Sequence, residues 1–287
     1  MSLIGTSDLV HDAAAAGSAV AAFNVITLEH IEAVVRGAEA AAAPVIIQIS
    51  ENAVRFHGGL VVPLARAATA LAQTSMYGVG LHLDHVTDLD LLRQAADAGF
   101  SSAMFDAGNL SYADNVARTV EAAQWAHANG LWLEAELGYV GGKPDAPASA
   151  HAAGVRTDRA EALTFVRDTG VDALAVAVGS SHAMTTRTAA LDHALIAELA
   201  EALPVPLVLH GSSGVPDEEL ARAVTAGMRK INIGTALNIA YTHGVRQFLD
   251  RDPKTVDPRK YLADARTEMA QVVEHMLHTI SKPVTAR

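Results

Sequence analysis

The chain has no cysteine, few aromatic residues and no concentration of positive charge. With zero cysteines in 287 residues, a disulfide framework and thiolate metal ligands are excluded, so any metal must be held by His, Asp or Glu. The net charge is -11, with 21 basic and 32 acidic residues and no basic cluster. Nucleic acid and anionic membrane surfaces are therefore not expected partners.

Long hydrophobic runs are also lacking. No uninterrupted apolar run approaches the roughly 20 residues that a membrane-spanning helix needs. No Lys or Arg precedes Arg36, which is the reverse of the basic start of a secretory signal. We therefore expect a cytoplasmic protein without a membrane segment.

The apolar residues that are present follow a repeating pattern. They make up 50% of the chain, and short runs rich in Val and Ile alternate with Ala-rich amphipathic stretches, as in repeated βα units. Eight parallel strands close a (β/α)8 barrel. We therefore predict an α/β fold, a single TIM-barrel domain over 1–287, with strands at 20–25, 45–50, 78–84, 102–106, 131–137, 173–179, 207–211 and 230–234.

Two segments lie outside this repeat. Residues 138–157 have neither helical nor strand periodicity and are rich in Gly, Pro and Ala. Connections of this length in a barrel are often functional lids, so we expect a mobile active-site loop, with a disordered insertion as the alternative. Residues 257–281 continue a helical pattern beyond the last strand, which predicts a C-terminal helical extension that packs outside the barrel or against a second subunit.

Three histidines stand at the ends of predicted strands, namely His85, His182 and His210. Active sites of TIM barrels lie at the C-terminal ends of the strands, so these side chains are expected to meet at one rim. Three neutral imidazoles form a standard Zn²⁺ site with an open position, and Asp84 would add an acid/base group beside it. The alternative is that each of the 13 histidines has a structural role, but three equivalent positions favour a metal.

Further polar residues belong to the same rim. Glu134 and Glu136 lie two residues apart in the fifth predicted strand, which allows both to point inward toward the metal. Residues 211–214 and 234–235 are Gly-, Ser- and Thr-containing turns after the last two strands. Barrels bind phosphate there through backbone N–H groups and a helix N-terminus. Together with a metal, these turns indicate a phosphorylated, oxygen-rich substrate.

Seven motifs, distributed in order over nearly the whole chain, carry a resemblance to a known family. They are Ala22-Phe23-Asn24-Val25, His82-Leu83-Asp84-His85, Glu134-Ala135-Glu136-Leu137-Gly138 with Gly141-Gly142, Val178-Gly179-Ser180-Ser181-His182, Leu209-His210-Gly211-Ser212-Ser213-Gly214-Val215-Pro216, Lys230-Ile231-Asn232-Ile233-Gly234-Thr235 and Asp257-Pro258-Arg259. The chain resembles the class II, metal-dependent ketose-bisphosphate aldolases, most closely their fructose/tagatose-bisphosphate branch.

The resemblance implies a role for each motif residue. One catalytic Zn²⁺ per subunit would be bound by His85, His182 and His210, with Glu136 as an alternative ligand. Asp84 would exchange the proton of the substrate's C4 hydroxyl. The family also often binds a monovalent cation, Na⁺ or K⁺. The dihydroxyacetone phosphate part would contact Asn24, Ser50, Gly211, Ser213, Asn232 and Thr235, and the second phosphate would contact Arg259 of a neighbouring subunit in a homodimer or homotetramer.

The implied reaction is reversible cleavage of fructose or tagatose 1,6-bisphosphate to dihydroxyacetone phosphate and glyceraldehyde 3-phosphate. Such a cleavage needs an electron sink at the C2 carbonyl, which a Lewis-acidic metal supplies, and a base for the C4 hydroxyl. It also needs a group that protonates C3. The family usually carries a glutamate for this after Gly141-Gly142, where the present chain has Lys143-Pro144-Asp145, so Asp145 is the candidate.

A second departure is Ala183, where the family has glycine directly after the metal-binding histidine. Because of the two departures, other substrates remain open. The chain could be a class II aldolase of another phosphorylated keto sugar or sugar acid, or a catalytically impaired sugar-phosphate-binding barrel.

Two further enzyme classes fit the residues less well. A Schiff-base aldolase needs a desolvated lysine inside the barrel. We expect Lys230 to start a strand at the opposite rim, and the other lysines lie in 138–157 or in the C-terminal region. A barrel metallohydrolase would be expected to carry a His-x-His pair at the end of the first strand, where this chain has Phe23-Asn24-Val25.

Overall fold

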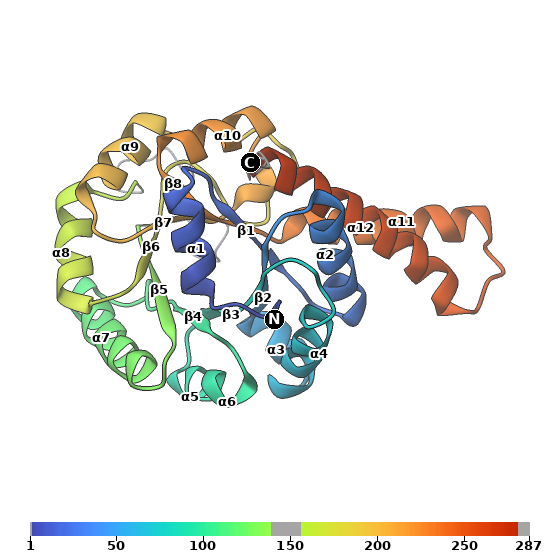
Figure 1. Ribbon diagram of the computed structural model, residues 1–287, viewed down its shortest axis with the longest axis horizontal. Helices are drawn as coiled ribbons and strands as arrows, with labels where there is room; N and C mark the ends of the chain where they lie inside the picture. The colour runs from blue at the N-terminus through green and yellow to red at the C-terminus, as the bar shows by residue number, and fades with distance from the viewer. Residues whose placement is uncertain (1, 139–155, 281–287) are drawn as a thin grey trace.

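The computed structural model describes residues 2–138 and 156–280. Eight parallel strands, paired in sequence order, close a barrel surrounded by helices, which confirms the predicted TIM barrel (Figure 1). All eight predicted runs contain a strand, with small shifts at the ends. The strands are β1 Val20–Asn24, β2 Val45–Ser50, β3 Val79–Val86, β4 Ser102–Phe105, β5 Trp132–Leu137, β6 Ala173–Val176, β7 Leu207–Leu209 and β8 Met228–Ile233.

The helices begin and end where the sequence indicates. Gly99, Gly170 and Gly227 follow helices with φ of 96°, 69° and 133°, a region in which a side chain would be strained. The helices are α1 Thr6–Ala15, α2 Leu28–Ala41, α3 Glu51–Phe56, α4 Val62–Ala72, α5 Leu89–Leu92, α6 Ala95–Ala98, α7 Tyr112–Ala128, α8 Arg159–Thr169, α9 His193–Ala202, the 3₁₀ turn η1 Ser212–Gly214, α10 Asp217–Ala226, α11 Thr235–Arg251 and α12 Pro258–Ile280.

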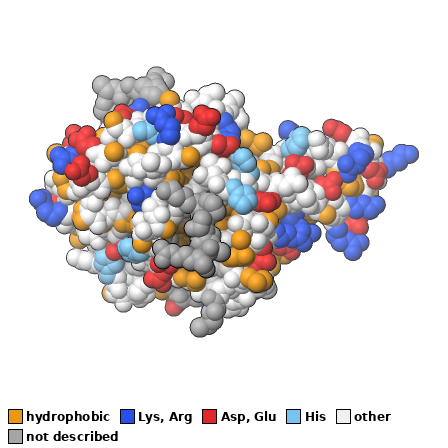
Figure 2. Space-filling view, turned by 45° about the horizontal axis from the view of Figure 1, so that its top comes forward, with side chains coloured by type: hydrophobic (Ala, Val, Ile, Leu, Met, Phe, Trp, Pro, Cys, Tyr) orange, Lys and Arg blue, Asp and Glu red, His pale blue; other side chains and the backbone are white. Residues whose placement is uncertain are grey.

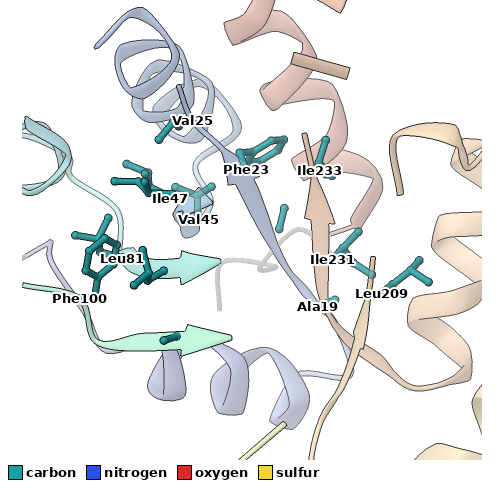
Figure 3. Packing of buried hydrophobic residues seen from close by; sticks show 14 of the residues in the cluster. Ala19, Phe23, Val25, Val45, Ile47, Leu81, Phe100, Leu209, Ile231 and Ile233 are labelled. Atoms are coloured by element: carbon teal, nitrogen blue, oxygen red, sulfur yellow. The ribbon is translucent and has the colours of Figure 1, made fainter. Parts of the chain in front are cut away.

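Alternate residues of each strand face the helices. In β1, Ala21 and Phe23 belong to the large apolar core between strands and helices, together with residues such as Ile47, Leu81 and Ile231 (Figure 3). This alternation follows from the two-residue period of a strand. It leaves the intervening residues of the strands to fill the interior of the barrel.

The barrel interior contains an apolar cluster, which we call the inner apolar cluster. It joins the barrel to α1, which lies across the barrel in the view of Figure 1. Gly80 keeps room for this helix, because a Cβ there would lie 3.1 Å from side-chain atoms of both Leu9 and Thr6. The cluster comprises Leu9, Val10, Val20, Ala22, Ile46, Trp132, Ala173, Ala175 and Val208.

Later along the same strands the inward-facing residues become polar. Gln48 follows Ile46 by two positions in β2, Asn24 follows Ala22 in β1, and Glu134 follows Trp132 in β5. The C-terminal ends of the strands are therefore the polar end of the interior, as expected for the active-site face of a TIM barrel.

The predicted C-terminal extension contains the long helix α12, while Ser281 lies outside the described residues. α11 and the first part of α12 form an arm that projects from the barrel and carries Lys and Arg side chains toward its tip (Figures 1 and 2). The rest of α12 packs against α2. Gly37 in α2 allows α12 to approach closely, because a Cβ at this position would lie 2.5 Å from Val273 of α12. Gly244 in α11 does the same, because a Cβ there would lie 2.7 Å from Ala265 of α12.

The predicted loop at 138–157 falls almost wholly outside the described residues, and so does Asp145. Its two ends are described at Gly138 and at Arg156 and Thr157, where Thr157 Oγ1 donates a hydrogen bond of 2.6 Å to the carbonyl of Leu137. Within the described ranges, every helix is too short or too polar to cross a membrane.

Candidate active site

The three predicted metal-binding histidines lie together. His85 is in β3, His182 follows β6 and His210 follows β7, and their ring centroids are 4.8 to 5.6 Å apart. Glu136 of β5 joins them, so that one candidate ligand atom from each of the four residues lies within 4.8 Å of the others. Three imidazoles and one carboxylate form a donor set that suits Zn²⁺.

The hydrogen bonds of His210 fit a metal at this position. Its buried Nδ1 has no hydrogen-bond partner and lies 3.3 Å from Glu136 Oε2. Its Nε2 lies 2.8 Å from Glu134 Oε1. A buried polar atom without a partner is costly, and a bound cation would remove that cost. For His85, the contact of Nδ1 with Asp106 Oδ2 at 3.3 Å leaves Nε2 for the metal.

Backbone strain also marks this site. His85 and Ala183 have positive φ angles of 49° and 58°, two of the three non-glycine residues in the described ranges to do so. A side chain in this left-handed region costs about 1–2 kcal/mol, and such strain is concentrated at functional sites. Ala183 directly follows His182, so both strained residues adjoin or belong to the histidine cluster.

Asp84 lies next to this cluster as an ionised carboxylate. Burial raises its pKa, but the positive charges of His85 and His210, together with those of His82 and Lys230, lower it overall. Its Oδ2 accepts a hydrogen bond of 2.7 Å from Asn24 Nδ2, whereas its buried Oδ1 has no partner. One carboxylate oxygen is therefore held in place, and the other has an unused acceptor position.

His210 is a strongly basic imidazole. Burial lowers its pKa, but the adjacent carboxylates of Glu134 and Glu136 raise it to about 9. Metal binding at Nδ1 requires that this nitrogen carry no proton. We therefore infer that a metal and a proton compete for His210.

The position of Lys230 corrects the sequence-based expectation. It is the third residue of β8 rather than a residue at the opposite rim, and its side chain is fully buried in the barrel. Its Nζ lies 2.8 Å from Glu134 Oε2. Burial raises the pKa of Glu134, but the charge of Lys230 and the contact with His210, with a smaller contribution from His82, together lower it overall. The inward direction of Lys230 could have been predicted from the sequence. Lys230 lies two positions before the inward-facing Asn232, and residues two positions apart in a strand share a face.

A cavity of about 500 Å³ opens beside Asp84 and the histidines. Two of its features are typical of phosphate sites: Gly211, with φ of 68°, and the N-terminus of α11, whose Ala236 N–H donates to Ser213 Oγ at 3.0 Å. Glu136 and His210 are buried and do not line it. The predicted residues that do are Asn24, Ser50, Asp84, His85, His182, Gly211, Ser213, Asn232 and Thr235.

Five further lining residues were missed from the sequence. Asn52, Ala53 and Phe56 lie on α3, directly after β2, and Asn238 lies in the first turns of α11. Ile26 follows β1. These residues could have been found from their place in the sequence, because residues that directly follow a barrel strand lie at the active-site face.

Arg259 is not brought to the cavity of its own chain. Its side chain is 89% exposed near the start of α12, on the projecting arm, and pairs with Asp257 at 2.8 Å. Among the described residues, no Lys or Arg lines the cavity. Any cationic contact to a second phosphate must therefore come from outside this set.

Comparisons with known proteins agree with this geometry. The family model described as "Fructose-bisphosphate aldolase class-II" matches residues 4–282. A fructose-bisphosphate aldolase of Geobacillus stearothermophilus is 35% identical over 274 residues, which cover 95% of each chain.

Solved structures give the same result. The YdjI aldolase of Escherichia coli K12 matches with a TM-score of 0.85 and 29% identity, over 99% of this chain and 100% of that one. The fructose-bisphosphate aldolase of Campylobacter jejuni has a TM-score of 0.82 at 23% identity, over 97% and 95%, and supports the fold alone. Since the family model and the Geobacillus relative both cover nearly the whole chain, the protein belongs to the class II fructose-bisphosphate aldolase family and is an aldolase, a carbon–carbon lyase.

Proposed function

We propose that this aldolase is zinc-dependent and reversibly cleaves fructose or tagatose 1,6-bisphosphate to dihydroxyacetone phosphate and glyceraldehyde 3-phosphate. The observation that carries the proposal is the group of four candidate ligand atoms from His85, Glu136, His182 and His210, all within 4.8 Å. The family generally uses a metal and acts on phosphorylated sugars. Zn²⁺ is favoured over harder cations because three of the four ligands are imidazoles.

The chain's residues divide the chemistry between them. A bound Zn²⁺ would act as a Lewis acid that draws electrons from the C2 carbonyl as the C3–C4 bond breaks. Asp84 takes the C4 hydroxyl proton through its free Oδ1 and returns it during condensation. Asp145 is the sequence-based candidate for protonating C3.

Substrate orientation follows from the cavity. The phosphate of the dihydroxyacetone part binds at Gly211, Ser213 and Thr235, where backbone N–H groups and a helix N-terminus favour an anion. Asn24, Ser50 and Asn232 face the same cavity and would hydrogen-bond the remaining oxygens. A monovalent cation, Na⁺ or K⁺, would support phosphate binding.

We propose that a second subunit binds the second phosphate. Because Arg259 lies on the projecting arm and outside its own chain's cavity, we propose that it reaches the cavity of a neighbouring subunit in a homodimer or homotetramer. Arginine suits this contact because its planar group binds phosphate in a bidentate manner. A chain that instead acts on another phosphorylated keto sugar or sugar acid would not need this contact.

The first experiment is a coupled cleavage assay on zinc-loaded protein with both bisphosphates, before and after EDTA. We expect EDTA-sensitive release of dihydroxyacetone phosphate, restored by Zn²⁺, and no release from the His210→Ala control. Activity that survives complete metal removal would contradict the metal dependence. Turnover of neither bisphosphate by metal-loaded, folded protein would point to another sugar.

Subunit complementation tests Arg259. Arg259→Ala and His210→Ala proteins are each expected to be nearly inactive on bisphosphates. When subunits are mixed and exchanged, the Arg259→Ala chain keeps an intact metal site and receives the arginine of its partner, so activity should reappear. No recovery in verified mixed oligomers would place Arg259 outside the neighbouring site.

A further inference from the structure

Lys230 is a buried cation at the centre of a hydrogen-bond network inside the barrel. Its Nζ lies 2.8 Å from Glu134 Oε2, 2.8 Å from Asn232 Oδ1 and 3.5 Å from Gln48 Oε1. An ammonium group has three N–H donors and no acceptor. All three neighbours must therefore turn an oxygen toward it, and this fixes the orientation of both amides.

The first branch of the network leads to the metal ligands. Glu134 binds Lys230 through Oε2 and approaches His210 Nε2 through Oε1 at 2.8 Å. A carboxylate can only accept, so His210 must carry its hydrogen on Nε2. Asn232 Nδ2 also lies 2.9 Å from Nε2, but a protonated nitrogen cannot accept from it. In the neutral ring the lone pair of His210 is thereby left on Nδ1, the nitrogen that faces Glu136.

The second branch leads to the base. Since Gln48 turns Oε1 toward Lys230, its Nε2 donates to Asn24 Oδ1 at 2.8 Å. Asn24 must then turn its own nitrogen outward, and Nδ2 donates to Asp84 Oδ2 at 2.7 Å. Each donor fixes the next, so the orientation is transmitted from the lysine to the carboxylate. Asp84 Oδ1 is left as the open oxygen.

We propose that Lys230 is a positioning residue that sets both halves of the active site: through Glu134 it fixes the His210 tautomer that presents Nδ1 to the metal, and through Gln48 and Asn24 it aims Asp84. The proposal rests on the proposed function, in which His210 is a ligand and Asp84 the base. Hydrogen-bonded partners behind metal ligands typically contribute 10–100-fold to metal affinity or activity.

Glu134→Gln tests the first branch. Its amide oxygen must face Lys230, so its NH₂ faces His210 Nε2 and drives His210 to the tautomer with hydrogen on Nδ1. We expect Zn²⁺ affinity, measured by chelator competition, to fall roughly 10–100-fold. ¹⁵N NMR of histidine-labelled, metal-free protein, recorded above the His210 pKa of about 9 so that the ring is neutral, should show the tautomer change, with the His210 signal assigned by its loss in His210→Gln.

The double variant Lys230→Met with Glu134→Gln provides the decisive comparison. Without the ammonium, the amide of Glu134→Gln can rotate, accept from His210 Nε2 and restore the original tautomer. Adding Lys230→Met should therefore recover part of the Zn²⁺ affinity that Glu134→Gln alone loses. Simple damage to the core would instead make the double variant worse. The neutral pair also avoids the unpaired buried carboxylate that could prevent Lys230→Met from folding.

Gln48→Met tests the second branch alone. It keeps a side chain of similar length but cannot orient Asn24, so we expect kcat to fall by about 10-fold while Zn²⁺ affinity stays within about twofold. The matched control is Ser102→Ala, which removes a buried inward-facing hydroxyl, bonded to His82, that lies outside both branches. It should change neither the tautomer nor kcat appreciably.

The outcomes separate this inference from the proposed function. Hydrogen on Nδ1 of the neutral His210 ring in the metal-free wild type, or unchanged Zn²⁺ affinity in Glu134→Gln, would overturn the positioning role even if the enzyme is a zinc aldolase. The expected tautomers in a protein that binds no Zn²⁺ would support the network and refute the metal-dependent function. An unchanged kcat in Gln48→Met would remove the second branch.

Discussion

The barrel interior has two parts that obey the same rule of alternation and differ in chemistry. The inner apolar cluster next to α1 consists of side chains such as Val20 and Ile46, which need only close packing. The polar network contains Glu134 and Lys230, which are equally buried. One part is stabilised by removal of apolar surface from water, and the other must compensate the desolvation of charges.

The difference explains why Lys230 is surrounded by acceptors. A buried charge is tolerated only with opposite charge and hydrogen bonds around it, and Lys230 has three acceptors within 3.5 Å. The inner apolar cluster contains no hydrogen bonds between side chains whose geometry must be kept. Substitutions in the inner apolar cluster should therefore mainly lower stability. Substitutions in the polar network should mainly lower metal affinity or the cleavage rate.

The largest expected effect is on the chemical side. Asp84→Asn keeps the shape of the side chain but removes the base, so we expect the cleavage rate to fall about 10²- to 10⁴-fold with bound zinc near one per subunit. Steady-state kinetics and metal analysis measure the two quantities. A near-normal rate would mean that another group takes the C4 proton.

Ile46→Ala should have the opposite profile. Ile46 is fully buried in the inner apolar cluster, and its truncation should lower the free energy of unfolding by about 2–5 kcal/mol. Ile46→Val, the matched control, should cost about 0.5–1.5 kcal/mol. Denaturant unfolding gives these values. A large loss of kcat in folded Ile46→Ala protein would break the division between the two parts.

His82 provides a pH-dependent test of the polar part. Burial, assisted by the charge of Lys230, lowers the pKa of His82 to about 3 from 6.5. The unfolded chain therefore binds more protons than the folded one between these values, so the contribution of His82 to stability is lost as pH falls through that window. In metal-free protein, stability should fall less steeply from pH 6.5 downward in His82→Gln than in wild type. Equal slopes would show that His82 does not contribute.

The smallest expected effect concerns the strained residue beside His182. Ala183 has φ of 58°, so Ala183→Gly should relieve the strain and raise stability by up to about 1 kcal/mol, reduced by the greater freedom of glycine when unfolded. Thermal unfolding in the presence and absence of zinc measures this. A loss of stability would mean that the methyl contacts in the cavity outweigh the strain.

Much of this structure could be predicted from periodicity. The apolar runs of β1 to β8 locate all eight strands, and glycines such as Gly99 and Gly170 mark helix ends, because these signals are local. The candidate ligands His85, His182 and His210 could be selected because barrel strands end on one face. Their roles as ligands stay a prediction.

Long-range contacts could not be predicted in the same way. Lys230 was expected at the opposite rim, but β8 begins two residues earlier than predicted, at Met228, and the long side chain of Lys230 is buried inside the barrel. Arg259 carries the family's motif, yet it lies on an arm away from its own cavity. The spacing of residues in the sequence does not indicate whether a residue on a projecting arm contacts the cavity of its own chain or that of another chain.

The sequence by itself determined the barrel, the face that carries the site and the residue types able to bind a metal and a phosphate. Strand period, strand-end position and side-chain chemistry are properties of short segments. Only the tertiary structure decided that Lys230 meets Glu134 and Gln48 from strands far apart in sequence, and so which way each amide and imidazole faces. Hydrogen-bond direction depends on partners that only closure of the barrel brings within reach.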